Sequence, residues 1–288
     1  MVGILRSMRP RQWAKNALVF AGVIFGGRLL DRSSLLAAVS AFAVFCLLSS
    51  AVYLINDSID RHADRRHPFK ARRPIAAGEV PVRVALIVAA ILVIAGLAFA
   101  MSLGAAFGMI SLLYVVLMAL YVSVLKHAVV VDVLAISAGF AIRAWAGAVA
   151  VHVPVSRWLL ILTVLLAALL SLIKRRAELV ELAHDASDHR RALRGYSVKL
   201  LDRAIAIVTA STLVTYAVYT VSPDTTARFG TNRLLLTLPL PAFGMARYLY
   251  LVYHGAGGSD PSEHLLSDLP LLGCVGLWVL AAIAVIYR

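Results

Sequence analysis

The chain has 288 residues, of which 61% are hydrophobic and only 15% are charged, and its mean hydropathy is +0.86. Soluble globular domains are closer to half apolar and a quarter charged, so this composition argues against a soluble enzyme and indicates an integral membrane protein. The formal net charge of +13 lies mainly in segments expected on one side of the membrane, so orientation accounts for much of it and no nucleic-acid partner is expected.

Apolar runs recur along the whole chain, and a helix needs about 20 such residues to cross a bilayer. Four of them are nearly uninterrupted, at 34–55, 84–103, 105–125 and 269–287. Five less pure runs lie near 13–30, 128–151, 156–173, 203–221 and 234–252. The sequence therefore predicts an all-α fold, a bundle of about nine transmembrane helices that forms one integral-membrane domain over residues 1–288.

The first run, 13–30, admits an alternative. It follows Arg6, Arg9, Arg11 and Lys15, and basic residues before an apolar stretch are also typical of a secretory signal peptide. No small-residue cleavage site comes after it, and many further runs do. We therefore expect a retained first span.

Basic residues concentrate in segments on the same side as the N-terminus, chiefly in two long connections at roughly 57–82 and 174–202. The positive-inside rule then predicts a multi-pass protein of the plasma membrane whose N-terminus and long connections face the cytoplasm. These connections also carry most of the polar side chains. We expect the active site at this cytoplasmic edge.

Oxygen-bearing side chains gather just after the second run. If its helix continues past Ile55, a rotation of about 100° per residue places four of them within one arc of roughly 100°. These four residues, which we call the acidic cluster, are Asn56, Asp57, Asp60 and Asp64. Like charges so close together repel one another and need compensation. Mg²⁺ prefers carboxylate oxygens and usually keeps substrate phosphates in its shell, so the cluster is a candidate metal site.

Basic residues follow the acidic cluster closely and admit two interpretations. In the first, the cluster is a solvated helix end whose aspartates pair with Arg61, Arg65 and Arg66, and no metal is needed. In the second, the basic residues bind phosphate oxygens, which suit the planar fork of arginine and the point charge of lysine. Beside a metal site we favour phosphate binding, with the following side chains: His67, Lys70, Arg72 and Arg73.

The stretch "NDSIDRHAD" (56–64) resembles the N-D-x-x-D-x-x-x-D motif of the UbiA-type intramembrane prenyltransferase superfamily. That resemblance implies a nine-helix fold that binds Mg²⁺ and a diphosphate in a cavity open to the cytoplasm. More narrowly, six stretches resemble the decaprenyl-phosphate phosphoribosyltransferases: "RPRQWAKN" (9–16), "HPFKARRPIAAG" (67–78), "YVSVLKHAVVVDVLAISAGFAIRAWAGA" (121–148), "KRRAEL" (174–179), "RALRGYS" (191–197) and "RYLYLV" (247–252). Such enzymes join phosphoribosyl diphosphate to a polyprenyl phosphate, in the supply of the arabinan donor of certain cell walls.

The resemblance also implies which residues form the site. Asp57, Asp60 and Asp64 are the expected catalytic residues, and together with Asn56 they are the expected Mg²⁺ ligands. The expected substrate-binding residues are Lys15, Asn16, Tyr53, His67, Lys70, Arg73, Tyr121, Lys126, Arg143, Lys174, Arg175 and Glu178.

Several of these residues have simpler interpretations from the sequence alone. Lys126 and Tyr121 suit an ordinary anchor at the membrane surface. Arg143 lies in a membrane run, where an ionised side chain is costly unless it faces a polar interior. It forms either part of a cavity wall or a structural ion pair with Asp132, which lies three turns away on the same predicted helix.

The second long connection departs from the wider superfamily. Aromatic prenyltransferases carry a second aspartate motif there, whereas this chain has Lys174, Arg175, Arg176 and Glu178. Asp185 and Asp188 lie further on, as a remnant of that motif or a solvated turn. One acidic and one basic group suit a donor with a metal-bound diphosphate and a separate phosphate, as in phosphoribosyl diphosphate.

Two other classes stay alternatives. An aromatic-acceptor prenyltransferase would use a prenyl diphosphate and a second aspartate cluster. A transporter would place its charges near the bilayer midplane, whereas the charged clusters here lie at the predicted rim. The sequence leaves open whether the chain forms a homo-oligomer.

Overall fold

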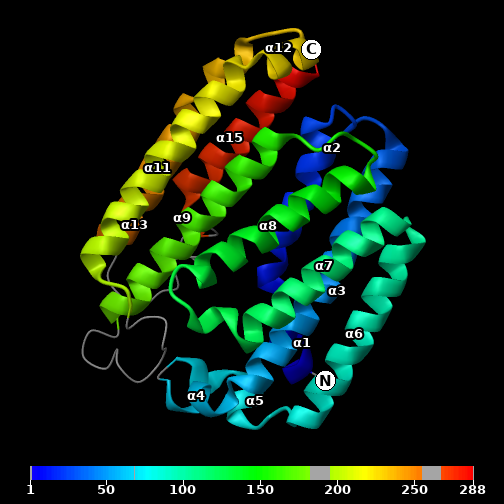
Figure 1. Cartoon of the computed structure of the whole chain (residues 1–288), viewed down its shortest axis with the longest axis vertical. Helices are drawn as coiled ribbons and strands as arrows, with labels where there is room; N and C mark the ends of the chain where they lie inside the picture. The colour runs from blue at the N-terminus through cyan, green and yellow to red at the C-terminus, as the bar shows by residue number, and fades with distance from the viewer. Residues whose placement is uncertain (1, 68, 182–194, 255–266, 288) are drawn as a thin grey trace. The chain divides into compact units, whose positions relative to one another are not determined.

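The computed structural model describes residues 2–67, 69–181, 195–254 and 267–287, and all regular elements within these ranges are helical (Figure 1). The prediction of an all-α fold is confirmed. In chain order, with η for a 3-10 helix, the elements are α1 (Val2–Met8), η1 (Pro10–Phe20), α2 (Ala21–Phe25), α3 (Arg32–Ile59), α4 (Arg61–Arg66), η2 (Lys70–Arg72), α5 (Pro74–Ala77), α6 (Val82–Ser102), α7 (Ala105–Ser123), η3 (Leu125–His127), α8 (Val131–Ala150), α9 (Arg157–Glu181), α11 (Val198–Val221), α12 (Pro223–Phe229), η5 (Arg233–Thr237), α13 (Pro239–His254) and α15 (Leu269–Ile286).

The helices divide into two compact units, Met1–Val155 and Ser156–Arg288. The first unit contains the acidic cluster and the helices from α1 to α8. The second contains α9 to α15 and the basic residues of the second long connection that the structure describes. A single catalytic domain over residues 1–288 stays a prediction.

Eight helices of the described ranges are long and apolar enough to cross a membrane. They are α3, α6, α7, α8, α9, α11, η5 with α13, and α15. Each coincides with one of the nine apolar runs expected from the sequence. The remaining run, 13–30, forms the 11-residue η1 and the five-residue α2 instead of one long α-helix. Side-chain contacts hold η1 against α3, where the Trp13 indole donates to the Ser50 hydroxyl over 3.0 Å.

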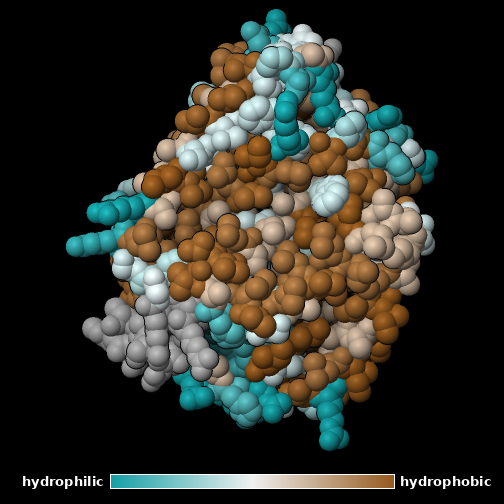
Figure 2. Space-filling view, in the orientation of Figure 1, coloured by the Kyte–Doolittle hydropathy of each residue, from teal (hydrophilic) through white to brown (hydrophobic). Residues whose placement is uncertain are grey.

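Large apolar side chains cover much of the visible surface (Figure 2). Ile87 and Ile94 on α6 are more than 60% exposed, as are Ile207 on α11 and Leu280 on α15. Exposed apolar surface on this scale is unusual for a soluble monomer. It is expected on helices whose outer faces meet lipid.

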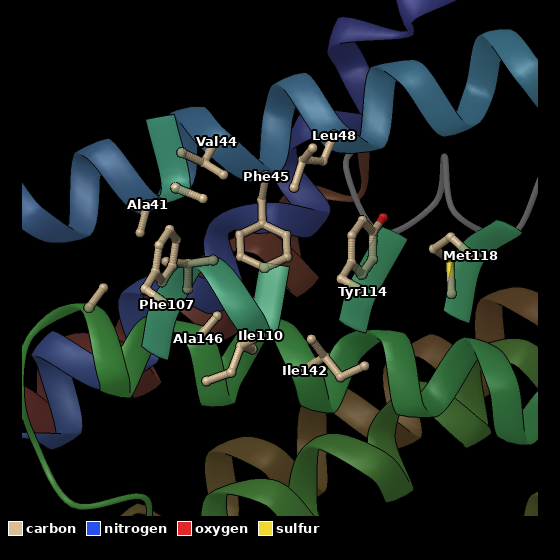
Figure 3. Packing of buried hydrophobic residues seen from close by; sticks show 13 residues of the cluster. Ala41, Val44, Phe45, Leu48, Phe107, Ile110, Tyr114, Met118, Ile142 and Ala146 are labelled. Carbon is tan, nitrogen blue, oxygen red and sulfur yellow. The ribbon is translucent and has the colours of Figure 1, made fainter. Parts of the chain in front are cut away.

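The core of the first unit lies between α3, α7 and α8 (Figure 3). The Phe45 ring of α3 meets Phe107 and Tyr114 of α7 edge-on, with centroid separations of 6.2 and 5.2 Å. Ile142 of α8 packs into the same cluster. Because this core holds α3 against α7 and α8, it also fixes where the polar end of α3 emerges.

Two glycines allow the N-terminal segment to approach α8 very closely. A Cβ at Gly147 would lie 2.0 Å from the Val19 carbonyl oxygen, and one at Gly22 would lie 2.6 Å from the Ala148 nitrogen. Both obstacles are backbone atoms, which rotamer changes cannot move. The absence of a side chain at Gly22 and Gly147 therefore lets η1 and α2 pack directly against α8.

Replacing Gly147 with alanine is expected to lower the free energy of unfolding by about 1–3 kcal/mol, because the backbone near Val19 must shift. Thermal unfolding of the detergent-purified protein measures this loss. Gly276→Ala is the matched control, since a Cβ there meets nothing within 4 Å. Equal losses in the two variants would show that close packing is not the cause.

In the second unit, α9 packs along α11 and α13 packs along α15. A polar group joins α11, η5 and α15: the Tyr216 and Thr237 hydroxyls share a 2.6 Å hydrogen bond, and the Trp278 indole donates to Tyr216 over 2.8 Å. Pairing of this kind is needed because lipid offers no hydrogen-bonding partners to polar groups.

Candidate active site at the end of helix α3

The acidic cluster spans the junction of α3 and α4, beside α5 and the N-terminal helix α1 (Figure 1). As expected, α3 continues past Ile55 and carries Asn56 and Asp57. The helix ends at Ile59, and Asp60, with φ −82° and ψ 0°, links it to α4, which carries Asp64. The four residues therefore come from two helices and the residue between them.

Two arginines clamp one half of the cluster. Arg9 Nη2 contacts both carboxylate oxygens of Asp57, at 2.6 and 2.9 Å. Arg73 Nη1 bridges two carboxylates, at 3.2 Å from Asp57 and 2.7 Å from Asp64. Asp57 is only 2% exposed and Asp64 only 5%, so these contacts compensate charges that are largely withdrawn from water.

A lysine bridges the other half. Lys126 Nζ in η3 lies 2.7 Å from an oxygen of Asp60 and 3.4 Å from the side-chain oxygen of Asn56. Lys126 is 4% exposed, so it is a buried cation rather than the surface anchor that the sequence alone also allowed. The structure thereby brings together residues that are 66 and 70 positions apart.

The partners of the aspartates differ from those of the simpler interpretation. That interpretation paired them with arginines of α4, but Arg65 donates to the Ala76 carbonyl oxygen over 2.8 Å. Arg9, Arg73 and Lys126, which we call the three bridging cations, contact the carboxylates instead. Burial raises the pKa of Asp64 above its usual 3.8, while the charges of Arg73 and Lys70 act to lower it.

Arg9 is a candidate site residue that the sequence alone did not single out. Its backbone has φ 56° and ψ 62°, a left-handed conformation that is uncommon for arginine, and its guanidinium lies 4.9 Å above the centre of the Tyr53 ring. In the sequence, Arg9 is only one of several basic residues near the N-terminus. The one signal that pointed to it was its place in "RPRQWAKN", since 48 residues separate it from Asp57.

Arg143 belongs to a separate, buried hydrogen-bond network. Its guanidinium donates to the Asn16 side-chain oxygen at 2.9 Å, the Tyr114 hydroxyl at 2.7 Å and the Gly139 carbonyl oxygen at 3.1 Å. Asp132 lies about 16 Å away along the axis of α8, beyond direct reach. These neutral contacts replace the structural ion pair with Asp132 that the sequence left open. Tyr114 was not foreseen.

The other expected residues of the first unit lie on the elements around the cluster. His67 caps α4, and its ring Nδ1 accepts from the Phe69 backbone N–H at 3.3 Å. Lys70 begins η2 and acts electrostatically on Asp64. Tyr121 packs against the core at the end of α7, and Lys15 is half-buried on η1.

The expected residues of the second unit form a group of their own on α9. Arg175, 2% exposed, contacts Glu178 over 2.6 Å, and Lys174 precedes it. Arg176 belongs to the same basic stretch but was not among the expected substrate-binding residues; it contacts Asp202 over 2.6 Å and lies 4.1 Å above the Tyr253 ring. Asp185 and Asp188, whose role the sequence left undecided, lie outside the described residues.

The donor chemistry of the acidic cluster fits a hard divalent cation. It offers three carboxylates and an amide oxygen, which are ligands that such a cation prefers. Two cationic nitrogens, Arg73 Nη1 and Lys126 Nζ, each contact a pair of these oxygens. In the arrangement described, no three His, Cys, Asp or Glu side chains of the described ranges converge on one metal position. Mg²⁺ ligation by Asn56, Asp57, Asp60 and Asp64 therefore stays a prediction.

Comparison with known proteins identifies the family. The family model described as "UbiA prenyltransferase family" matches residues 17–267. The chain belongs to this family. Membership agrees with the motif at 56–64 and with the eight membrane-length helices, and it makes the chain a multi-pass membrane protein.

Curated relatives of this UbiA-family chain share nearly its whole length. Decaprenyl-phosphate phosphoribosyltransferase of Mycolicibacterium smegmatis is 34% identical, covering 99% of this chain and 92% of that protein. The protein of the same name from Corynebacterium glutamicum is 31% identical, covering 99% and 87%. That from Mycobacterium tuberculosis is 33% identical, covering 97% and 92%.

Solved structures share the fold. A UbiA homolog from Archaeoglobus fulgidus bound to GPP and Mg²⁺ has a TM-score of 0.74 at 21% identity, covering 99% of this chain and all of that one. The same homolog bound to Cd²⁺ has a TM-score of 0.71 at 20% identity, with the same coverage. Divalent cations thus occur in solved structures of this fold.

Proposed function

We propose that the chain transfers the 5-phosphoribosyl group of phosphoribosyl diphosphate to a polyprenyl phosphate, decaprenyl phosphate in the first instance, and releases diphosphate. The observation that carries the proposal is 34% identity over 99% of the chain to a decaprenyl-phosphate phosphoribosyltransferase. The reaction would take place at the cytoplasmic side of the membrane, where the basic connections are expected.

The distribution of charged residues favours this donor over a prenyl diphosphate. Phosphoribosyl diphosphate carries a diphosphate at one end of its ribose and a phosphate at the other. The sequence has two separate charged groups: the acidic cluster with its bridging cations, and the basic start of the second long connection, Lys174 to Arg176. A prenyl diphosphate has a single diphosphate and offers nothing for the second group to bind.

In the proposed chemistry, the bond from the anomeric carbon to the diphosphate oxygen breaks, and its electron pair leaves with diphosphate. Bound Mg²⁺ would neutralise charge that develops on that leaving group. Arg9, Arg73 and Lys126 would share this charge through their N–H groups. A phosphate oxygen of the lipid forms the new bond from the opposite face, which inverts the anomeric configuration.

The acceptor needs no side chain to remove a proton, because a phosphate monoester with a second pKa near 6 is largely dianionic at neutral pH. Catalysis would then depend chiefly on positioning and on electrostatic stabilisation. Lys174 and Arg175 are the proposed contacts for the 5-phosphate or the lipid phosphate.

A direct assay tests the proposal. Purified protein receives labelled phosphoribosyl diphosphate, Mg²⁺ and a panel of polyprenyl phosphates, and the label is followed into the lipid fraction. We expect a labelled lipid product that depends on both substrates. Turnover of prenyl diphosphate with an aromatic acid, and none with phosphoribosyl diphosphate, would instead identify an aromatic prenyltransferase.

A further inference from the structure

The acidic cluster and the three bridging cations form a locally balanced set of charges. Three carboxylates, Asp57, Asp60 and Asp64, are in direct contact with three cationic side chains. Most of the set is withdrawn from water: the side chains of Asp57, Asp64 and Lys126 are 2%, 6% and 5% exposed, whereas that of Asp60 is 31% exposed. Buried ions are strongly destabilising when one partner is removed, so such a set resists any change that leaves a charge unpaired.

The oxygens that the metal would ligate are the same oxygens that the cations hold. Arg73 Nη1 lies between Asp57 and Asp64, and Lys126 Nζ lies between Asp60 and Asn56. A divalent cation that entered alone would meet like charge at close range and would have to displace these groups. The displaced ammonium and guanidinium groups would then lack a counter-charge.

An anionic ligand removes this obstacle. The side chains of Arg9 and Arg73 are 25% and 26% exposed, whereas those of Asp57 and Asp64 are 2% and 6% exposed, so an entering ligand meets the two arginines before these carboxylates. Both cations suit diphosphate oxygens as well as carboxylates. When they turn to a diphosphate, the carboxylate oxygens become available to the metal, whose two positive charges offset much of the negative charge that the diphosphate brings.

We propose that Arg9, Arg73 and Lys126 couple the two ligands of the site, so that a divalent metal binds the acidic cluster tightly only when the diphosphate donor draws these cations away. The three residues are positioning residues that exchange carboxylate oxygens for diphosphate oxygens. Arg9 thereby joins the proposed site. Its backbone is left-handed and its guanidinium lies over the Tyr53 ring. The inference rests on the proposed function for the identity of the anion.

Metal binding without any substrate tests the coupling. Mn²⁺, which shares the oxygen-ligand preference of Mg²⁺, is titrated into detergent-purified protein and its free fraction is followed by electron paramagnetic resonance. We expect weak binding by the unaltered chain and at least about tenfold tighter binding by Lys126→Met, since that change removes a competing charge next to Asp60. Lys199→Met, on the exposed start of α11, is the matched control and is expected to change nothing.

A second variant guards against misfolding of the first. Arg9→Met leaves Asp57 in contact with Arg73 and is also expected to tighten Mn²⁺ binding, while the KM for phosphoribosyl diphosphate rises. Loss of a merely structural residue would not strengthen binding of the metal while it weakens binding of the donor. Circular dichroism and gel filtration establish that each variant is folded.

Mn²⁺ binding that is unchanged or weaker in both folded variants would overturn the coupling. So would tight binding that survives addition of Asp60→Asn to Lys126→Met, because the metal would then lie elsewhere. No phosphoribosyl substrate is present in the titration, so these outcomes leave the proposed reaction to its own assay.

Discussion

Replacement of Asp64 with asparagine is expected to lower phosphoribosyl transfer by about 10³-fold or more, because a proposed metal ligand is lost from a site that works by charge stabilisation. The substitution keeps the shape of the side chain, and Arg73 keeps its contact with Asp57, so the fold is expected to survive. The initial rate of label transfer to the lipid, at saturating Mg²⁺, measures the effect. Asp60→Asn is expected to lower the rate of transfer by a factor of the same order.

Asp224→Asn is the matched control for these two variants. Asp224 is an aspartate of α12 in the second unit that pairs with Arg157 on an exposed surface, and exposed pairs contribute little to stability. We expect near-unaltered transfer in this variant. Near-normal transfer in Asp64→Asn or Asp60→Asn at ordinary Mg²⁺ would remove the metal assignment from the acidic cluster.

Replacement of Arg143 with methionine is expected to lower the apparent melting temperature by about 5–15 °C, from a loss of roughly 2–5 kcal/mol. Methionine fills much of the space but leaves the Asn16 oxygen and the Tyr114 hydroxyl without their donor inside the bundle. Thermal unfolding of the purified protein in one detergent gives the measurement. Arg28→Met, at an exposed position, is expected to leave the melting temperature unaltered.

A second substitution separates the causes. Tyr114→Phe alone removes a hydrogen bond to a charged group and is expected to destabilise the protein. Added to Arg143→Met, the same change is expected to recover part of the loss, because the hydroxyl is then no longer left unpaired. A double variant no more stable than Arg143→Met would show that the Tyr114 hydroxyl does not account for the penalty.

Most of the fold could be predicted because its signal is local in the sequence. Span 34–55 became α3 at Arg32–Ile59, and span 84–103 became α6 at Val82–Ser102. Length and apolarity suffice in such cases, since lipid leaves a helix as the simplest way to satisfy the backbone. The exception was 13–30, where glycine contacts with α8 and polar contacts with α3 accompany a 3-10 helix.

The candidate site could be predicted only in part. The four residues of the acidic cluster lie within a stretch of nine residues, so their spacing in the sequence is enough to identify them as a cluster. Their cations do not, because Arg9 and Lys126 come from segments 48 and 66 residues away. In the sequence both look like residues that orient a membrane protein, and that explanation accounts for them fully until their contacts are known.

The sequence by itself determined the membrane class, the helical spans, the acidic cluster and the motif shared with the UbiA family, because all four are patterns along the chain. Only the tertiary structure decided which cation meets which carboxylate, that Arg9 contacts the buried Asp57, and that Arg143 has neutral partners. The physical reason is that buried charges must be compensated wherever folding places them, and a one-dimensional pattern does not encode which distant segments meet.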